Sequence, residues 1–143
     1  MFCFAETVRF ADTDMMGVAH HANYFRWFES ARVAFLQAAG VDLWDLMKAG
    51  YSFPIRDARC AYKVSARYGD CLDIQATMLE LTRAKMIFSY QVRRRGDAKL
   101  LAEGYTCNVF TNADGKVARL RDEFYQPLLS FCEKEKPAAG SEP

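Results

Sequence analysis

The chain has 143 residues, the length of one domain, and 51% of them are apolar, so it can bury a substantial core and is not a disordered protein. Its 19 Lys and Arg residues nearly balance 18 Asp and Glu residues, which argues against binding of nucleic acid or of an anionic membrane through bulk charge. The N-terminal segment lacks a basic signal region, no apolar run reaches the ~18 residues of a membrane-spanning helix, and the five cysteines form no CxxC pair. We therefore expect a cytoplasmic protein with reduced thiols and no stable membrane insertion.

The N-terminal third of the sequence predicts one strand and two helices. The strand ends near Ala11, and a long helix runs from about His21 to Ala39. Three of its apolar residues recur at helical spacing, namely Phe28, Ala31 and Phe35. Other apolar residues lie outside this stripe, so much of the helix surface should be covered. A shorter helix is expected from Asp42 to Ala49.

From Tyr51 onward the pattern is typical of strands. Between Lys85 and Arg95, every second residue is a large apolar or aromatic one, which predicts a half-buried strand. The other expected strands are Phe53–Val64, Cys71–Leu81 and Leu100–Thr111. The simplest way to bury the long helix is to wrap an antiparallel sheet of about five strands around it. The sequence thus predicts an α+β fold in a single domain, residues 1–132, followed by a polar, flexible tail at 133–143.

The residues best suited to chemistry lie between Asp12 and Tyr24, just before the long helix. This segment contains two carboxylates and both histidines of the protein. A helix N-terminus offers unpaired N–H groups and a positive dipole end, which can polarise a carbonyl group. A carboxylate on the preceding loop can act as a nucleophile or a general base. The simpler interpretation of each Asp is a helix cap or a turn residue, and that of Gly17 is a permissive backbone conformation.

Motifs for other chemistries are incomplete or absent. Asp12-x-Asp14 followed by Gly17 is superficially similar to a calcium loop, but Met16 and Asn23 stand where further ligands would be needed. Two adjacent histidines and scattered cysteines do not make a zinc site. The sequence has no GxSxG elbow, P-loop or GxGxxG motif. We therefore expect no metal and no other cofactor.

The run FADTDMMGVAHHANY at residues 10–24, continued by FESAR at 28–32, closely resembles the signature of hotdog-fold acyl-CoA thioesterases of the 4-hydroxybenzoyl-CoA thioesterase and YbgC-like type. The stretch Tyr62–Asp70 also resembles a segment of these enzymes, so the resemblance covers most of residues 5–125. It implies a hotdog fold and the hydrolysis of an acyl-CoA thioester to a free acid and CoA. It also implies a site built across the subunits of a homodimer or homotetramer.

The resemblance further implies roles for individual residues. Asp14 would be the catalytic carboxylate, either as a nucleophile or as a base that activates water. His21 would donate its backbone N–H to the thioester carbonyl, and its side chain is also important in the YbgC-like branch. Asn23 would support the loop and helix start, and Tyr24 would lie close to the acyl pocket. The substrate-binding residues expected from the loop also include Gly17 and Val18.

Basic residues that could bind the CoA phosphates are candidates only, because Lys and Arg are more often simply exposed to solvent. These candidates are Lys63, Arg67, Arg83 and Lys85. The identity of the acyl group stays open, since the residues that could line its pocket suit either an aromatic ring or a linear chain. These residues are Tyr24, Trp27, Phe28, Phe53 and Pro54. Two alternatives also stay open: a non-catalytic acyl-CoA-binding protein, and a hotdog dehydratase, whose His-Phe-Pro signature is absent.

Overall fold

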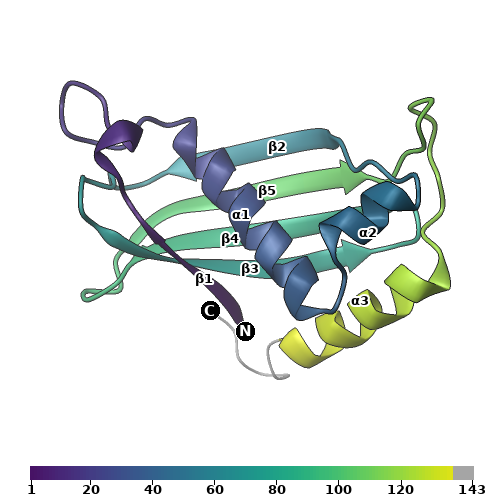
Figure 1. Cartoon of the computed structure of the whole chain (residues 1–143). Coiled ribbons are helices and arrows are strands. Elements are labelled where there is room, and N and C mark those ends of the chain that lie inside the picture. Colours follow the sequence, from purple (N-terminus) through teal and green to yellow (C-terminus); the bar gives the residue numbers. More distant parts are fainter. Residues whose placement is uncertain (137–143) are drawn as a thin grey trace.

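The computed structural model describes residues 1–136 of the chain. In chain order the elements are β1 (Phe2–Thr7), the 3-10 helix η1 (Phe10–Asp12), α1 (Asn23–Ala38), α2 (Leu43–Lys48), β2 (Ile55–Tyr62), β3 (Cys71–Leu81), β4 (Lys85–Arg94), β5 (Leu100–Val109) and α3 (Asp122–Glu135). The strands form one antiparallel sheet in the order β1-β3-β4-β5-β2, and α1 lies across one face of it (Figure 1). The predicted α+β hotdog architecture is confirmed.

The core lies between α1 and the sheet because both elements present apolar residues to each other. Phe28 of α1 is fully buried and stacks on Tyr90 of β4 with ring centroids 4.4 Å apart. Gly104 of β5, which pairs with Tyr90, permits this contact. A Cβ atom added at Gly104 would lie 2.3 Å from Cζ of Phe28. The glycine is therefore required by the close approach of helix and sheet.

Element boundaries differ from the predicted ones by a few residues. α1 begins at Asn23 rather than His21, so His21 precedes the helix. β2 covers only Ile55–Tyr62 of the strand expected at 53–64. Pro54, which has no N–H to donate to a sheet, stands immediately before its first residue.

The C-terminal helix α3 was missed by the sequence analysis. It buries Phe124, Leu128 and Cys132, which recur every four residues, and Phe131 packs edge-on against Phe35 at 4.9 Å. Pro127 inside the helix weakens the helical pattern, because proline removes a backbone donor. α3 continues three residues into the segment predicted as a flexible tail, and residues 137–143 of that segment lie outside the described residues.

Within residues 1–136, no helix combines the length and apolarity needed to cross a membrane.

Candidate active site

The loop before α1 makes a tight turn that presents Asp14. The Asp14 N–H donates to the Val18 carbonyl at 2.9 Å, and the Gly17 N–H donates to the Asp14 carbonyl at 3.2 Å. Gly17 has φ +76°, a left-handed conformation that favours glycine. The Met16 N–H donates to Oδ1 of Asp14 at 2.8 Å, which holds the carboxylate in place. Within the described residues Oδ2 of Asp14 has no hydrogen-bond partner, so it is available to a ligand.

Asp12 and Asn23 hold this loop to the start of the helix. The Asn23 side chain donates to the Asp12 carbonyl at 2.7 Å, and the His20 N–H donates to the same carbonyl at 2.8 Å. The Asp12 carboxylate accepts from the Arg9 N–H at 2.8 Å. Val18 forms a bridge with Arg67 and so joins the loop to the segment before β3. These contacts join the loop to the helix start and to the segment before β3.

His21 stands at the N-terminal end of α1 with a free backbone donor. The neighbouring N–H groups are occupied: Ala22 donates to the His20 ring and Asn23 donates to the His20 carbonyl. The His21 N–H has no acceptor within residues 1–136. The positive end of the α1 dipole lies at the same place. A ligand oxygen placed here would meet one free donor in a favourable field.

Asp14 and His21 line the same pocket, whose volume is about 300 Å³. Its other lining residues are Ala19, His20, Tyr24, Tyr62, Lys63, Val64 and Ser65. The structure thus brings together Asp14, His21, Tyr24 and Lys63 from the predicted site. Gly17 and Val18 belong to the loop, Asn23 is the first residue of α1, and none of the three lines this pocket. No three His, Cys, Asp or Glu side chains in the described part of the chain gather into a possible metal site.

Tyr62 is a pocket residue that was not among the predicted site residues. Its hydroxyl donates to the His21 carbonyl at 2.9 Å, and its ring packs edge-on against Tyr24 at 4.9 Å. Desolvation by burial, followed by a hydrogen bond with Cys60, raises the pKa of Tyr62 to about 12. Tyr62 begins the family-like stretch at residues 62–70, which was the available signal for its role.

The structure does not bring Arg83 and Lys85 to this pocket. Both lie beyond the end of β3, whereas the Asp14 loop packs against the segment before β3 begins. A strand of β3's length spans roughly 35 Å. Arg83 donates to the Leu120 carbonyl at 3.0 Å and pairs with Asp122 of α3, while Lys85 lies 3.5 Å from Glu80. A contact of these two residues with CoA stays a prediction.

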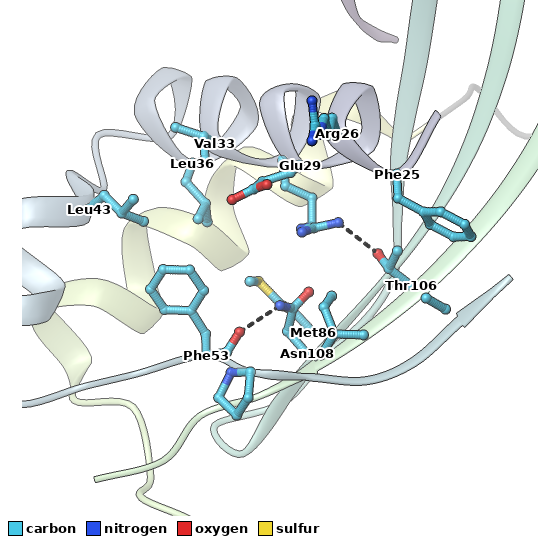
Figure 2. A pocket seen from close by; sticks show the side chains of 14 residues that line it. Phe25, Arg26, Glu29, Val33, Leu36, Leu43, Phe53, Met86, Thr106 and Asn108 are labelled. Carbon is cyan, nitrogen blue, oxygen red and sulfur yellow. Dashed lines mark hydrogen bonds between the residues drawn. The ribbon is translucent and has the colours of Figure 1, made fainter. Parts of the chain in front are cut away.

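A separate pocket of about 440 Å³ lies along α1, between the helix, the segment that leads into β2 and the inner face of the sheet (Figure 2). We call it the α1 groove. Its lining residues are Phe25, Arg26, Glu29, Arg32, Val33, Leu36, Leu43, Phe53, Pro54, Ile55, Ala58, Met86, Thr106 and Asn108. Phe53 and Pro54, two of the residues suggested for an acyl pocket, line it, whereas Trp27 and Phe28 are buried in the core. Its polar residues were not predicted.

Comparison with known proteins places this chain in a family. Residues 8–128 match the model described as the Thioesterase-like superfamily. A protein of Aquifex aeolicus (strain VF5), provisionally named an esterase, is 32% identical over 127 residues, which is 89% of this chain and 97% of that protein. The acyl-CoA thioester hydrolase YbgC of Escherichia coli O6:H1 is 28% identical over 92 residues, 64% of this chain and 69% of that protein.

A solved structure shares the fold. The 1,4-dihydroxy-2-naphthoyl-CoA thioesterase from Synechocystis superposes with a TM-score of 0.83 at 22% identity, over 95% of this chain and 98% of that one.

Proposed function

The chain belongs to the thioesterase-like superfamily, and from this premise we propose that it hydrolyses an acyl-CoA thioester to a free acid and CoA. Asp14 supplies the reacting carboxylate, and the backbone N–H of His21 polarises the thioester carbonyl. One observation carries the proposal. A carboxylate with a free oxygen and a helix-start N–H with no acceptor in the described chain line the same pocket.

The chemistry suits so small a set of groups. When a nucleophile adds to the thioester carbon, the negative charge that develops on oxygen is stabilised by the His21 N–H and the α1 dipole. Collapse of this intermediate breaks the C–S bond. The leaving thiolate is weakly basic, since a thiol has a pKa of ~8.5, so a strong general acid is not required. The nucleophile is either Asp14 itself, through an anhydride that water then opens, or a water molecule that gives its proton to Asp14.

The family resemblance and the sheet both favour a homodimer or homotetramer. β2 is an edge strand, and all but one of its residues are exposed. Such an edge offers unpaired backbone donors and acceptors to a second copy. We infer that the subunits join so that the pocket beside β2 is completed by the partner.

All five cysteines are unpaired, which fits the cytoplasmic location inferred above.

The test is release of CoA by Asp14→Asn, measured with a thiol reagent on a panel of acyl-CoA thioesters. We expect kcat to fall by ~10²–10⁴-fold, because a positioned base or nucleophile contributes that much, with the thermal midpoint nearly unchanged. Asp114→Asn, an exposed turn residue, is the matched control and should keep full activity. Unaltered turnover by Asp14→Asn would overturn the role of Asp14, and tight binding without turnover by the wild type would favour a non-catalytic protein.

A further inference from the structure

The free edge of β2 carries two opposite charges on the outer face of the sheet. Asp57 and Arg59 stand two residues apart, so they point to the same face. Ala58, between them, lines the α1 groove on the inner face, which assigns both charged side chains to the outer one. The side chains of Asp57 and Arg59 are 50% and 67% exposed, so this edge is open to a partner.

Arg59 is held beside this edge by its neighbours. It lies opposite Tyr105 of β5, and its guanidinium carbon is 4.2 Å from the centroid of the Tyr105 ring. Nη2 of Arg59 is also 3.7 Å from Oδ2 of Asp57. Within residues 1–136, neither charge has another ion-pair partner. An exposed pair at this distance contributes little by itself, so both groups keep capacity for a second partner.

The backbone of β2 restricts how a second copy can pair with it. The Lys63 N–H donates to the Leu101 carbonyl of β5 at 2.8 Å. Because backbone direction alternates along a strand, Arg59 also faces β5, whereas Ala58 and Cys60 face the free edge. A symmetric dimer joins two such edges antiparallel about a two-fold axis. Edge-facing residues then meet edge-facing residues, so one residue of β2 lies directly opposite its own copy.

Charge distinguishes among the residues near the middle of β2 that could lie opposite their own copies. With Asp57 there, two carboxylates would face each other, and with Arg59 there, two guanidinium groups would. Like charges directly opposite each other destabilise a strand pair. With Cys60 there, no charged residue of β2 would face an opposite charge within the strand. With Ala58 there, Asp57 faces the partner's Arg59, and Arg59 faces the partner's Asp57.

We propose that Asp57 and Arg59 govern self-recognition of the chain, because each forms an ion pair with the opposite charge of the partner subunit across a two-fold axis at Ala58. This inference rests on the homodimer included in the proposed function, and it adds the register of the two strands and the ion pairs that fix it. Since the strands are antiparallel, the start of β2 in the partner subunit lies beside Tyr62, which lines the Asp14 pocket. The two ion pairs therefore also set which part of the partner reaches the active site.

The experiment reverses the two charges in the full chain. Asp57→Arg gives an edge with two cations, and Arg59→Asp gives an edge with two anions, so two copies of either variant repel each other at both positions. We expect the Kd of the dimer, measured by sedimentation over a dilution series, to rise about tenfold or more for each. The double variant Asp57→Arg/Arg59→Asp should return to the wild-type Kd, because both ion pairs form again with their signs exchanged. An equimolar mixture of the two single variants should form 1:1 heterodimers.

Arg95→Asp is the matched control, because it changes the net charge as Arg59→Asp does. Arg95 follows β4, away from the β2 edge, and pairs with Asp73 at 2.7 Å. This variant should keep the wild-type Kd. Arg59→Ala provides a second test: it should weaken the dimer, whereas a register with Arg59 opposite its own copy would make the variant dimer tighter.

Three results would overturn the inference and leave the proposed function standing: a single reversal with an unaltered Kd, a double variant that stays weak, or a tighter Arg59→Ala dimer. A wild-type chain that stays single and still hydrolyses acyl-CoA would overturn both the ion pairs and the shared site. A wild-type dimer that responds to the reversals as expected but hydrolyses no thioester would support the ion pairs and overturn the proposed catalysis.

Discussion

Single residues at the candidate site divide into reacting groups and groups that position them. Asp14 and the His21 N–H are free to meet a substrate, whereas Tyr62 acts on His21 through its carbonyl. The raised pKa of Tyr62, about 12, keeps its hydroxyl neutral at any ordinary assay pH. Because the neutral form is favoured in the folded state, this shift stabilises the fold below pH ~10, and the contribution disappears as the pH rises toward 12.

Tyr62→Phe tests the positioning role. Loss of one hydrogen bond to a neutral carbonyl should lower kcat/KM by about fivefold, equivalent to ~1 kcal/mol. The shape of the pH–rate profile between pH 6 and 9 should not change, because the Tyr62 hydroxyl does not ionise there. Tyr68→Phe, an exposed tyrosine, serves as the control. A basic limb present in the wild type and absent in Tyr62→Phe would instead make Tyr62 a proton donor.

Gly104→Ala tests how closely helix and sheet must approach. The added methyl group would overlap the Phe28 ring, which is fully buried and stacked on Tyr90. We expect the free energy of unfolding to fall by about 1–3 kcal/mol, as for overpacked cores, measured by chemical denaturation. Phe28→Leu in the same chain should recover part of this loss by making room. Additive effects of the two substitutions would show that the contact is not the cause.

At the scale of elements, α3 links the far end of the sheet to the C-terminal part of α1. Arg83 pairs with Asp122 at the start of α3, and its guanidinium lies over the Tyr125 ring at 4.4 Å. Near the other end, burial raises the pKa of Cys132 to about 11. The Cys132 thiol is therefore protonated at pH 8 and unreactive while α3 stays in place, since the thiolate is the nucleophile.

Arg83→Gln distinguishes an anchor of α3 from a ligand of CoA. If Arg83 holds α3, iodoacetamide should label Cys132 faster in the variant at pH 8, while KM for an acyl-CoA stays the same. Labelling of the exposed Cys71 should be equally fast in both proteins and provides the internal control. A raised KM with unchanged labelling of Cys132 would favour the predicted contact between Arg83 and CoA.

At the scale of the whole molecule, the exposed β2 edge leads us to expect a homodimer or homotetramer. Light scattering should give a molar mass of two or four times the 16.3 kDa chain. If the partner subunit completes the pocket, specific activity should fall on dilution. The fall should occur over the same range of protein concentration in which the molar mass falls to that of a single chain. A single-chain mass at micromolar concentration together with full activity would contradict a shared site.

The sequence alone was sufficient for features carried by short-range patterns. The alternation in β4 and the helical spacing in α1 predicted a strand and a helix, because each period is a property of local backbone geometry. The Asp14 loop was also recognisable, since its turn, its glycine and the helix start are close neighbours along the chain. Two local elements were missed. α3 is interrupted by Pro127, and the first strand, expected to end near Ala11, ends at Thr7 and is followed by the 3-10 helix η1.

Contacts between distant parts of the chain were decided by the tertiary structure. Tyr62 reaches His21 across 41 residues, and Arg32 reaches Thr106 across 74. Both pairings depend on strand order and register, which place β2 and β5 beside α1, and no local period encodes them. For the same reason Arg83 and Lys85, which resemble other basic surface residues in sequence, lie at the opposite end of the sheet. The candidate reacting groups therefore come from one local motif, while the groove along α1 exists only in the folded chain.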